Sequence, residues 1–173
     1  MKIQRELTIN ASSEKVWDVL ARQFDHVDRW VSSVYRSSGR KDIRALNGAP
    51  SSGRICQTEL GPFKERIVEY DEDRRILAYD AKGEKMPFFV KSLQNRWVLS
   101  PVSDSKTHVD MLMTADLALP FNLFMGPIMR LQLSRILSFA TEELKHFVET
   151  GQPHPRKVAS DQKAGIQTRA EAA

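Results

Sequence analysis

Residues 121–149 read FNLFMGPIMRLQLSRILSFATEELKHFVE. Apolar side chains recur in this stretch at every third or fourth position, at Met129, Leu133, Ile136, Ala140, Leu144 and Phe147. That spacing predicts one helix of about 25 residues with a continuous apolar stripe along one side. Gly151 follows the stretch, with Pro153 and Pro155 just beyond it, a pattern that is typical of a helix C-terminus.

The chain before this helix carries strand signals with one helical interruption. Residues 2–10 alternate apolar and polar side chains, which is the period of a half-buried strand. Residues 10–13 hold an Asn and two Ser as suitable N-caps of a short helix that ends near Arg22, and a second helical turn covers residues 24–30. The remaining strands follow one another without helices between them, at residues 34–40, 54–60, 63–70, 75–81, 88–99 and 107–117.

These elements predict an α+β fold in which a curved antiparallel sheet of about six or seven strands wraps around the long C-terminal helix. Two short helices follow the first strand. Residues 151–173 contain no aromatic residue and no apolar period, so we expect one domain over residues 1–150 and a disordered tail after it. Because one helix cannot fill the concave side of a bent sheet, we also expect an apolar cavity between sheet and helix.

The composition favours an ordinary globular domain and excludes several classes of protein. With 173 residues, 41% of them hydrophobic, the chain can bury a sizeable core without a metal or a disulfide. Its single cysteine, Cys56, excludes an intramolecular disulfide and a cysteine-rich metal site. The net charge of +4 is too thinly spread for a nucleic-acid-binding face. We therefore expect no nucleic-acid partner, no metal and no cofactor.

The distribution of charge also bears on location. Residues 1–6, MKIQRE, carry charges where a signal peptide needs an apolar stretch. The uncharged run of residues 117–129 is shorter than the about 20 apolar residues that span a bilayer. We expect a cytoplasmic protein without a transmembrane segment. Residues 117–125 fit either a mobile apolar lid that touches a membrane transiently or simple packing over the end of the sheet.

Three segments carry a resemblance to a known family. Residues 11–20 read ASSEKVWDVL, residues 61–71 read GPFKERIVEYD and residues 144–149 read LKHFVE, while Trp30 follows the second short helix. In this order they resemble the START-like, or helix-grip, superfamily (SRPBCC), and more narrowly its polyketide cyclase/dehydrase and lipid-transport group. The resemblance implies a helix-grip domain over residues 1–150. It says less about function, because this fold hosts many unrelated activities.

The strand of residues 88–99 suggests how a ligand would be held in the expected cavity. Phe89, Leu93, Trp97 and Leu99 share one face with Lys91 and Asn95, and this face is more apolar than the opposite one. Lys91 and Asn95 would then be polar contacts in an apolar pocket. The candidate ligand-binding residues are Trp30, Tyr35, Tyr79, Phe89, Lys91, Asn95, Trp97, Met111, Met113, Phe124 and Met129.

No catalytic arrangement stands out among the titratable residues. His108 and Asp110 share the face of a strand that we expect to meet water, and Cys56 has no sequence neighbour that would activate it. The leading hypothesis is therefore binding or carriage of a small hydrophobic ligand, such as a lipid, a quinone or a polyketide-like molecule. The alternatives are an enzyme of the cyclase or dehydratase kind acting in the same cavity, and a partner-docking assembly factor.

Overall fold

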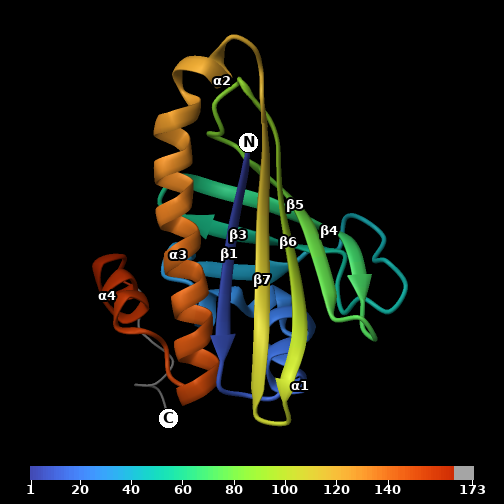
Figure 1. Cartoon of the computed structure of the whole chain (residues 1–173). Coiled ribbons are helices and arrows are strands. Elements are labelled where there is room, and N and C mark those ends of the chain that lie inside the picture. Colours follow the sequence, from blue (N-terminus) through green and yellow to red (C-terminus); the bar gives the residue numbers. More distant parts are fainter. Residues whose placement is uncertain (166–173) are drawn as a thin grey trace.

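The computed structural model describes residues 1–165 and shows one curved sheet with a long helix across its concave side (Figure 1). The strands are β1 (Lys2–Ile9), β2 (Arg36–Gly39), β3 (Gly53–Thr58), β4 (Gly61–Asp71), β5 (Ile76–Gly83), β6 (Val90–Ser103) and β7 (Lys106–Leu117). The helices are α1 (Ser13–Trp17), η1 (Asp18–Arg22), η2 (Phe24–Arg29), α2 (Phe121–Phe124), α3 (Gly126–Thr150) and α4 (Pro155–Lys163). Among these described residues, no helix has both the length and the apolar character needed to span a membrane.

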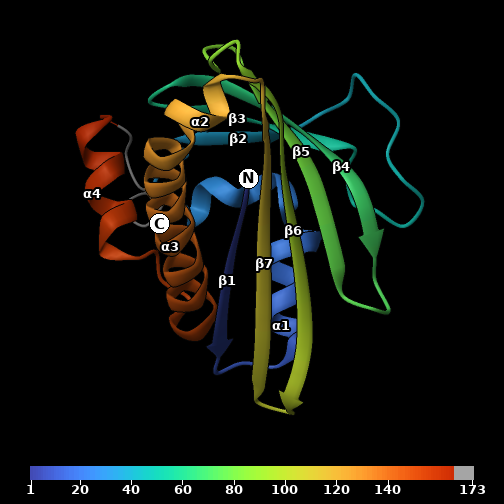
Figure 2. The ribbon, with the colours of Figure 1, turned by 45° about the horizontal axis from the view of Figure 1, so that its top comes forward.

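The seven strands form a single antiparallel sheet in the order β1-β7-β6-β5-β4-β3-β2. Strands β2 to β7 follow one another as the predicted meander. β1 joins the far side of β7, and α1, η1 and η2 carry the chain from there to β2 (Figure 2). The α+β helix-grip prediction, with two short helical segments after the first strand, is confirmed.

α3 packs on the sheet mainly through its second half. Its buried side chains begin at Leu137 and include Leu144, Phe147 and Val148. The predicted stripe is wrong at Ile136, whose side chain is 46% exposed. Leu133, Leu144 and Phe147 of the predicted stripe face the sheet, and Leu137, Thr141 and Val148 complete the buried side in place of Ile136.

The first short helix begins as its sequence predicts. The hydroxyl of Ser12 accepts a hydrogen bond from Lys15 N at 3.3 Å, which caps the helix, and Val16 and Trp17 enter the core. The indole nitrogen of Trp17 donates to Glu72 at 2.7 Å, in the turn between β4 and β5. This contact connects α1, which follows β1, to the turn between β4 and β5.

Glu72 is the centre of a hydrogen-bond network. Trp17 and Tyr70 each donate to its carboxylate at 2.7 Å, Arg75 donates at 2.8 Å, and Arg22 donates as well. Burial alone would raise the pKa of Glu72, but these hydrogen bonds outweigh it and lower the pKa to about 2. The network therefore holds Glu72 as a carboxylate well into the acid range.

Acid unfolding should report on this network. Because the folded pKa of Glu72 lies below its ordinary value of 4.5, its contribution to stability is present above about pH 4.5 and is lost as the pH falls toward 2. We expect Glu72→Gln to lower the urea midpoint at pH 7 and to reduce the further loss on acidification. Since the side chain is 39% exposed, solvent screening keeps the effect near about 1 kcal/mol. As a control, Asp104→Asn at an exposed turn should change neither the urea midpoint at pH 7 nor the loss of stability on acidification. If Glu72→Gln lost as much stability on acidification as the wild-type protein, the network would not be the source of the acid sensitivity.

The prediction of a disordered tail is wrong for residues 155–163, which form α4. The helix is held by polar contacts. Lys157 Nζ is buried and donates to Val34 O at 2.8 Å and to Asp161 at 2.7 Å, and Ser160 Oγ donates to Ser32 O at 2.7 Å. Apolar periodicity in the sequence does not reveal polar contacts of this kind. The predicted domain boundary at residue 150 therefore separates two segments that pack together. Residues 166–173 of the expected tail lie outside the described residues.

Candidate functional site

The inner face of the sheet brings predicted site residues together from three neighbouring strands. Tyr79 in β5 lies opposite Asn95 in β6, and Asn95 lies opposite Met113 in β7. Trp97 and Met111 form a pair in the next row. All five side chains are buried, so β6 turns its Trp97 face inward.

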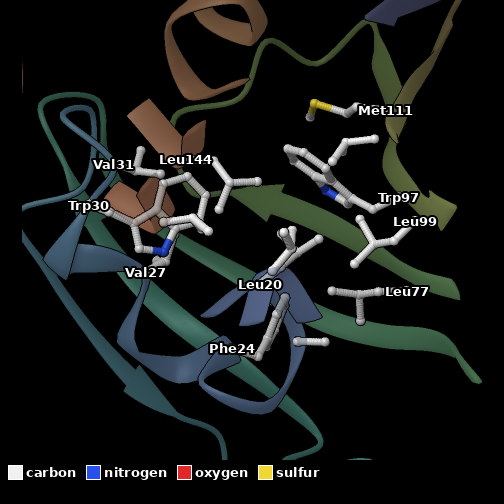
Figure 3. Close-up of a cluster of buried hydrophobic side chains, with 14 of the residues drawn as sticks. Leu20, Phe24, Val27, Trp30, Val31, Leu77, Trp97, Leu99, Met111 and Leu144 are labelled. Atoms are coloured by element: carbon white, nitrogen blue, oxygen red, sulfur yellow. The ribbon is translucent and has the colours of Figure 1, made fainter. Parts of the chain in front are cut away.

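Figure 3 shows that Trp97 and Met111 belong to the same apolar cluster as Trp30 and Leu144. Trp30 follows η2, and Leu144 comes from the second half of α3. The sheet, the segment around η2 and the long helix therefore meet at this cluster.

Two polar atoms on the inner face lack a hydrogen-bond partner among residues 1–165. Asn95 Oδ1 and Trp97 Nε1 are both buried and unpaired there. Burial raises the pKa of the nearby Tyr79 phenol to about 12, so the phenol keeps its proton at neutral pH. Trp97 Nε1 lies near the Tyr79 phenol and opposes part of this increase in the pKa. The geometry of the two groups is nevertheless outside that of a hydrogen bond. Tyr79, Asn95 and Trp97 thus place three polar groups on an otherwise apolar wall.

A buried ion pair borders this wall on the side of β3 and β4. Arg54 donates through Nε to Glu65, its neighbour across the two strands, and through Nη1 to Phe24 O at 2.6 Å. Its guanidinium lies 3.9 Å from the centre of the Phe24 ring and 5.2 Å from that of Tyr79. The charge of Arg54 is therefore already matched by Glu65.

Cys56 lies two residues along β3 from Arg54 and is only 2% exposed. Burial raises the pKa of its thiol to about 12. The thiol therefore stays protonated at neutral pH and is a poor nucleophile. This burial agrees with the sequence, in which Cys56 has no neighbour that would activate it.

A cavity of about 460 Å³ lies where α3 begins and β7 ends, lined by Met1, Asp116, Leu117, Gly126, Pro127 and Arg130. It opens to solvent because the first turns of α3 make few buried contacts with the sheet. The inward side of β7 continues from Leu117 through Ala115 to Met113. The cavity thus lies at the end of the wall that carries Asn95 and Trp97.

The sequence and the structure were compared with known proteins. The family described as "Polyketide cyclase / dehydrase and lipid transport" matches residues 1–149. The chain belongs to this family. No curated protein matches the chain significantly.

Three solved structures share the fold of this chain at low sequence identity. A START superfamily protein from Mycobacterium smegmatis has a TM-score of 0.70 and 15% identity, covering 87% of this chain and 99% of that one. Norcoclaurine synthase from Thalictrum flavum has a TM-score of 0.64 and 14% identity, covering 87% and 94%. The di-domain aromatase/cyclase BexL has a TM-score of 0.64 and 10% identity, covering 85% and 47%. At these identities the likeness shows the fold alone.

The other predicted site residues of this family member lie outside the central rows of β5–β7 and differ in burial. Trp30 is buried, and Tyr35 and Met129 are half-buried. Phe89 is half-buried and stacks on Phe121 of α2, with ring centres 5.0 Å apart. Phe124 is 69% exposed.

Lys91 does not share the face of Trp97, contrary to the sequence prediction. The pairing of β6 with β7 shifts between Val90 and Ser92, and this irregularity breaks the alternation that the prediction assumed. Lys91 is consequently exposed.

Sequence reasoning missed Arg54 and Glu65, which lie beside the wall. Their strands were predicted, and a buried Arg in alternation with Cys56 was the available signal. The partner of Arg54 could not be named without the register of β3 and β4. Within residues 1–165, no group of three or more His, Cys, Asp or Glu side chains could hold a metal ion.

Proposed function

We propose that this chain binds a small hydrophobic molecule, such as a lipid, a quinone or a polyketide-like compound, between the inner face of β5–β7 and α3. The observation that carries the proposal is the open cavity at the first turns of α3, which is lined by Leu117 of β7, and the buried inner side of β7 continues from there through Ala115 to Met113. Ligand pockets in proteins are concave and combine apolar surface with a few polar groups, and this cavity has Asp116 and Arg130 beside Met1, Leu117 and Pro127.

The titratable groups beside the wall favour binding over catalysis. A cyclase or dehydratase would need a group that gives or takes a proton near neutral pH at the substrate. Tyr79 and Cys56 both have a pKa of about 12, and Arg54 is engaged by Glu65. Tyr79 could still donate a hydrogen bond, which suits ligand orientation.

The surface around the cavity supports access by a hydrophobic molecule. Large apolar side chains are exposed on α2 and the connection that precedes it, on the first turns of α3, and on the connection between β5 and β6, at Phe88, Leu119, Leu123, Phe124, Ile128 and Leu131. These segments lie at the same end of the molecule (Figure 1). Monomeric proteins rarely expose a large contiguous apolar patch without a binding role. A ligand released from a lipid phase would meet this end first.

Binding can be tested with N-phenyl-1-naphthylamine, a neutral probe whose fluorescence rises in apolar sites. We expect a saturable rise with wild-type protein. Met113→Trp adds volume to the wall and should weaken binding about tenfold or more. Leu112→Trp makes the same kind of change on the opposite face of β7 and should leave binding unchanged.

Circular dichroism on both variants separates loss of binding from loss of fold. Overpacking a solid core typically destabilises a protein by about 1–3 kcal/mol, whereas a cavity accepts the added volume. Ala115→Met is a smaller change on the same wall and serves if Met113→Trp does not fold. Absence of saturable binding, or equal effects of the Met113 and Leu112 variants, would refute the proposal. Native mass spectrometry of the purified protein would then identify any co-purified molecule.

A further inference from the structure

The unpaired polar atoms of β6 indicate which polar group a ligand on the inner face of the sheet should carry. Buried polar groups are nearly always hydrogen-bonded, because an unpaired one is destabilising. Asn95 is 6% exposed and Trp97 is 2% exposed, yet Asn95 Oδ1 and Trp97 Nε1 have no partner among the described residues. Both side chains lie on the inner face, two residues apart on one strand.

The two unpaired atoms differ in hydrogen-bonding character, and a single small group that contacts both must suit each of them. The indole N–H of Trp97 can only donate and Asn95 Oδ1 can only accept, so a bridging oxygen must both accept and donate.

The surroundings exclude the other common polar groups of hydrophobic molecules. A carboxylate placed at these two atoms would need a free cation beside them. Arg54, the cation next to Tyr79, is paired with Glu65, and Arg130 lies away from these atoms, at the cavity at the end of the wall. An ether or ketone oxygen only accepts, so it would leave Asn95 Oδ1 without a partner. A hydrocarbon would leave both atoms unpaired. The phenol of Tyr79, opposite Asn95, adds a further donor on the same wall.

We infer that Asn95 and Trp97, with Tyr79 beside them, form an anchor for the hydroxyl of an alcohol or phenol on an otherwise apolar ligand. This inference rests on the proposed function and narrows its ligand class. The hydroxyl accepts from Trp97 Nε1 and donates to Asn95 Oδ1, while the apolar body lies toward Met113 and the cavity at Leu117. A carboxylate or a hydrocarbon at this position would leave at least one of the two atoms without a partner.

Four compounds with the same ring system test the anchor directly. They are naphthalene, 2-methoxynaphthalene, 2-naphthol and 2-naphthoate, which carry no polar group, an acceptor, a hydroxyl and a carboxylate. We measure their dissociation constants at pH 7 by displacement of N-phenyl-1-naphthylamine. Wild-type protein should bind 2-naphthol about tenfold more tightly than each of the others.

Substitutions then assign that preference to the two side chains. Asn95→Leu keeps the approximate size of the side chain, Trp97→Phe keeps an aromatic ring of smaller volume, and both remove the hydrogen-bonding atoms. Each should abolish the preference for 2-naphthol and leave naphthalene binding within about twofold. Gln94→Leu is the matched control, because Gln94 precedes Asn95 on β6 and donates to Asp80 on the other face. It should retain the full preference.

A ligand-free measurement provides a second test. If Asn95 Oδ1 is unpaired in the free protein, Asn95→Leu should raise Tm, since an apolar side chain of similar shape suits the wall better. A fall in Tm, with equal affinities for all four compounds in wild-type protein, would show that an ordered water already satisfies these atoms and would overturn the anchor. Absence of binding by any of the four compounds would instead refute the proposed function itself.

Discussion

A chain that ends at Thr150 should lose about 3–5 kcal/mol of unfolding free energy relative to a chain that ends at Gly165. Glu143 is 1% exposed on α3, and Arg156 of α4 donates to its carboxylate at 3.0 Å. Removal of α4 leaves this carboxylate with Ser32 alone, and removing one partner of a buried ion pair is strongly destabilising. The same cut removes the hydrogen bond from Lys157 to Val34 O.

Urea denaturation of the two chains measures this difference. The control is the chain ending at Gly165 compared with the full-length chain, for which we expect equal midpoints within error. Glu143→Gln in the shorter chain should recover part of the loss, because a neutral amide is easier to bury than a carboxylate. If the shorter chain kept the full-length midpoint, α4 would contribute nothing to the fold.

Arg54→Met is the second substitution for which we expect a large effect, about 3–5 kcal/mol of unfolding free energy. It leaves the Glu65 carboxylate, only 12% exposed, without its cation. It also removes the donor to Phe24 O and the contact with the Phe24 ring. The loss comes chiefly from the charge that remains buried, so Glu65→Leu added to Arg54→Met should restore much of the stability.

A surface ion pair on the neighbouring strands provides the comparison. Arg66 donates to Asp80 at 3.2 Å, and their side chains are 59% and 42% exposed. Arg66→Met should therefore change stability by less than about 1 kcal/mol. Chemical denaturation of the three variants tests both statements, and similar losses in Arg54→Met and Arg66→Met would mean that burial does not decide the effect.

The fold could be predicted because its signals are local. The alternation of residues 2–10 and the apolar spacing from Leu133 to Leu144 are visible without any tertiary contact. The prediction failed where partners from distant segments decide the outcome. Lys157 can be buried because Val34 O and Asp161 accept hydrogen bonds from its ammonium group. Ile136 is exposed because no element among the described residues covers it.

The candidate site shows the same division. The Trp97 face of β6 follows from its apolar count, and Asn95 lies on it as the alternation predicts. Lys91 does not, because the register shift near Val90 is a property of the strand pair and not of β6 alone. The unpaired state of Asn95 Oδ1 and Trp97 Nε1 likewise requires the positions of every neighbour.

Cys56 has a practical consequence for experiments on this protein. It is the single cysteine of the chain, it is 2% exposed, and burial raises the pKa of its thiol to about 12. Maleimides and spin labels react with exposed thiolates, so the wild-type chain gives them almost nothing to modify at neutral pH. A cysteine introduced at Leu131 on the exposed side of α3 would consequently be labelled alone, without prior removal of the native thiol. A label at this one position would report on the surroundings of α3 when candidate ligands are added, in an otherwise unaltered core.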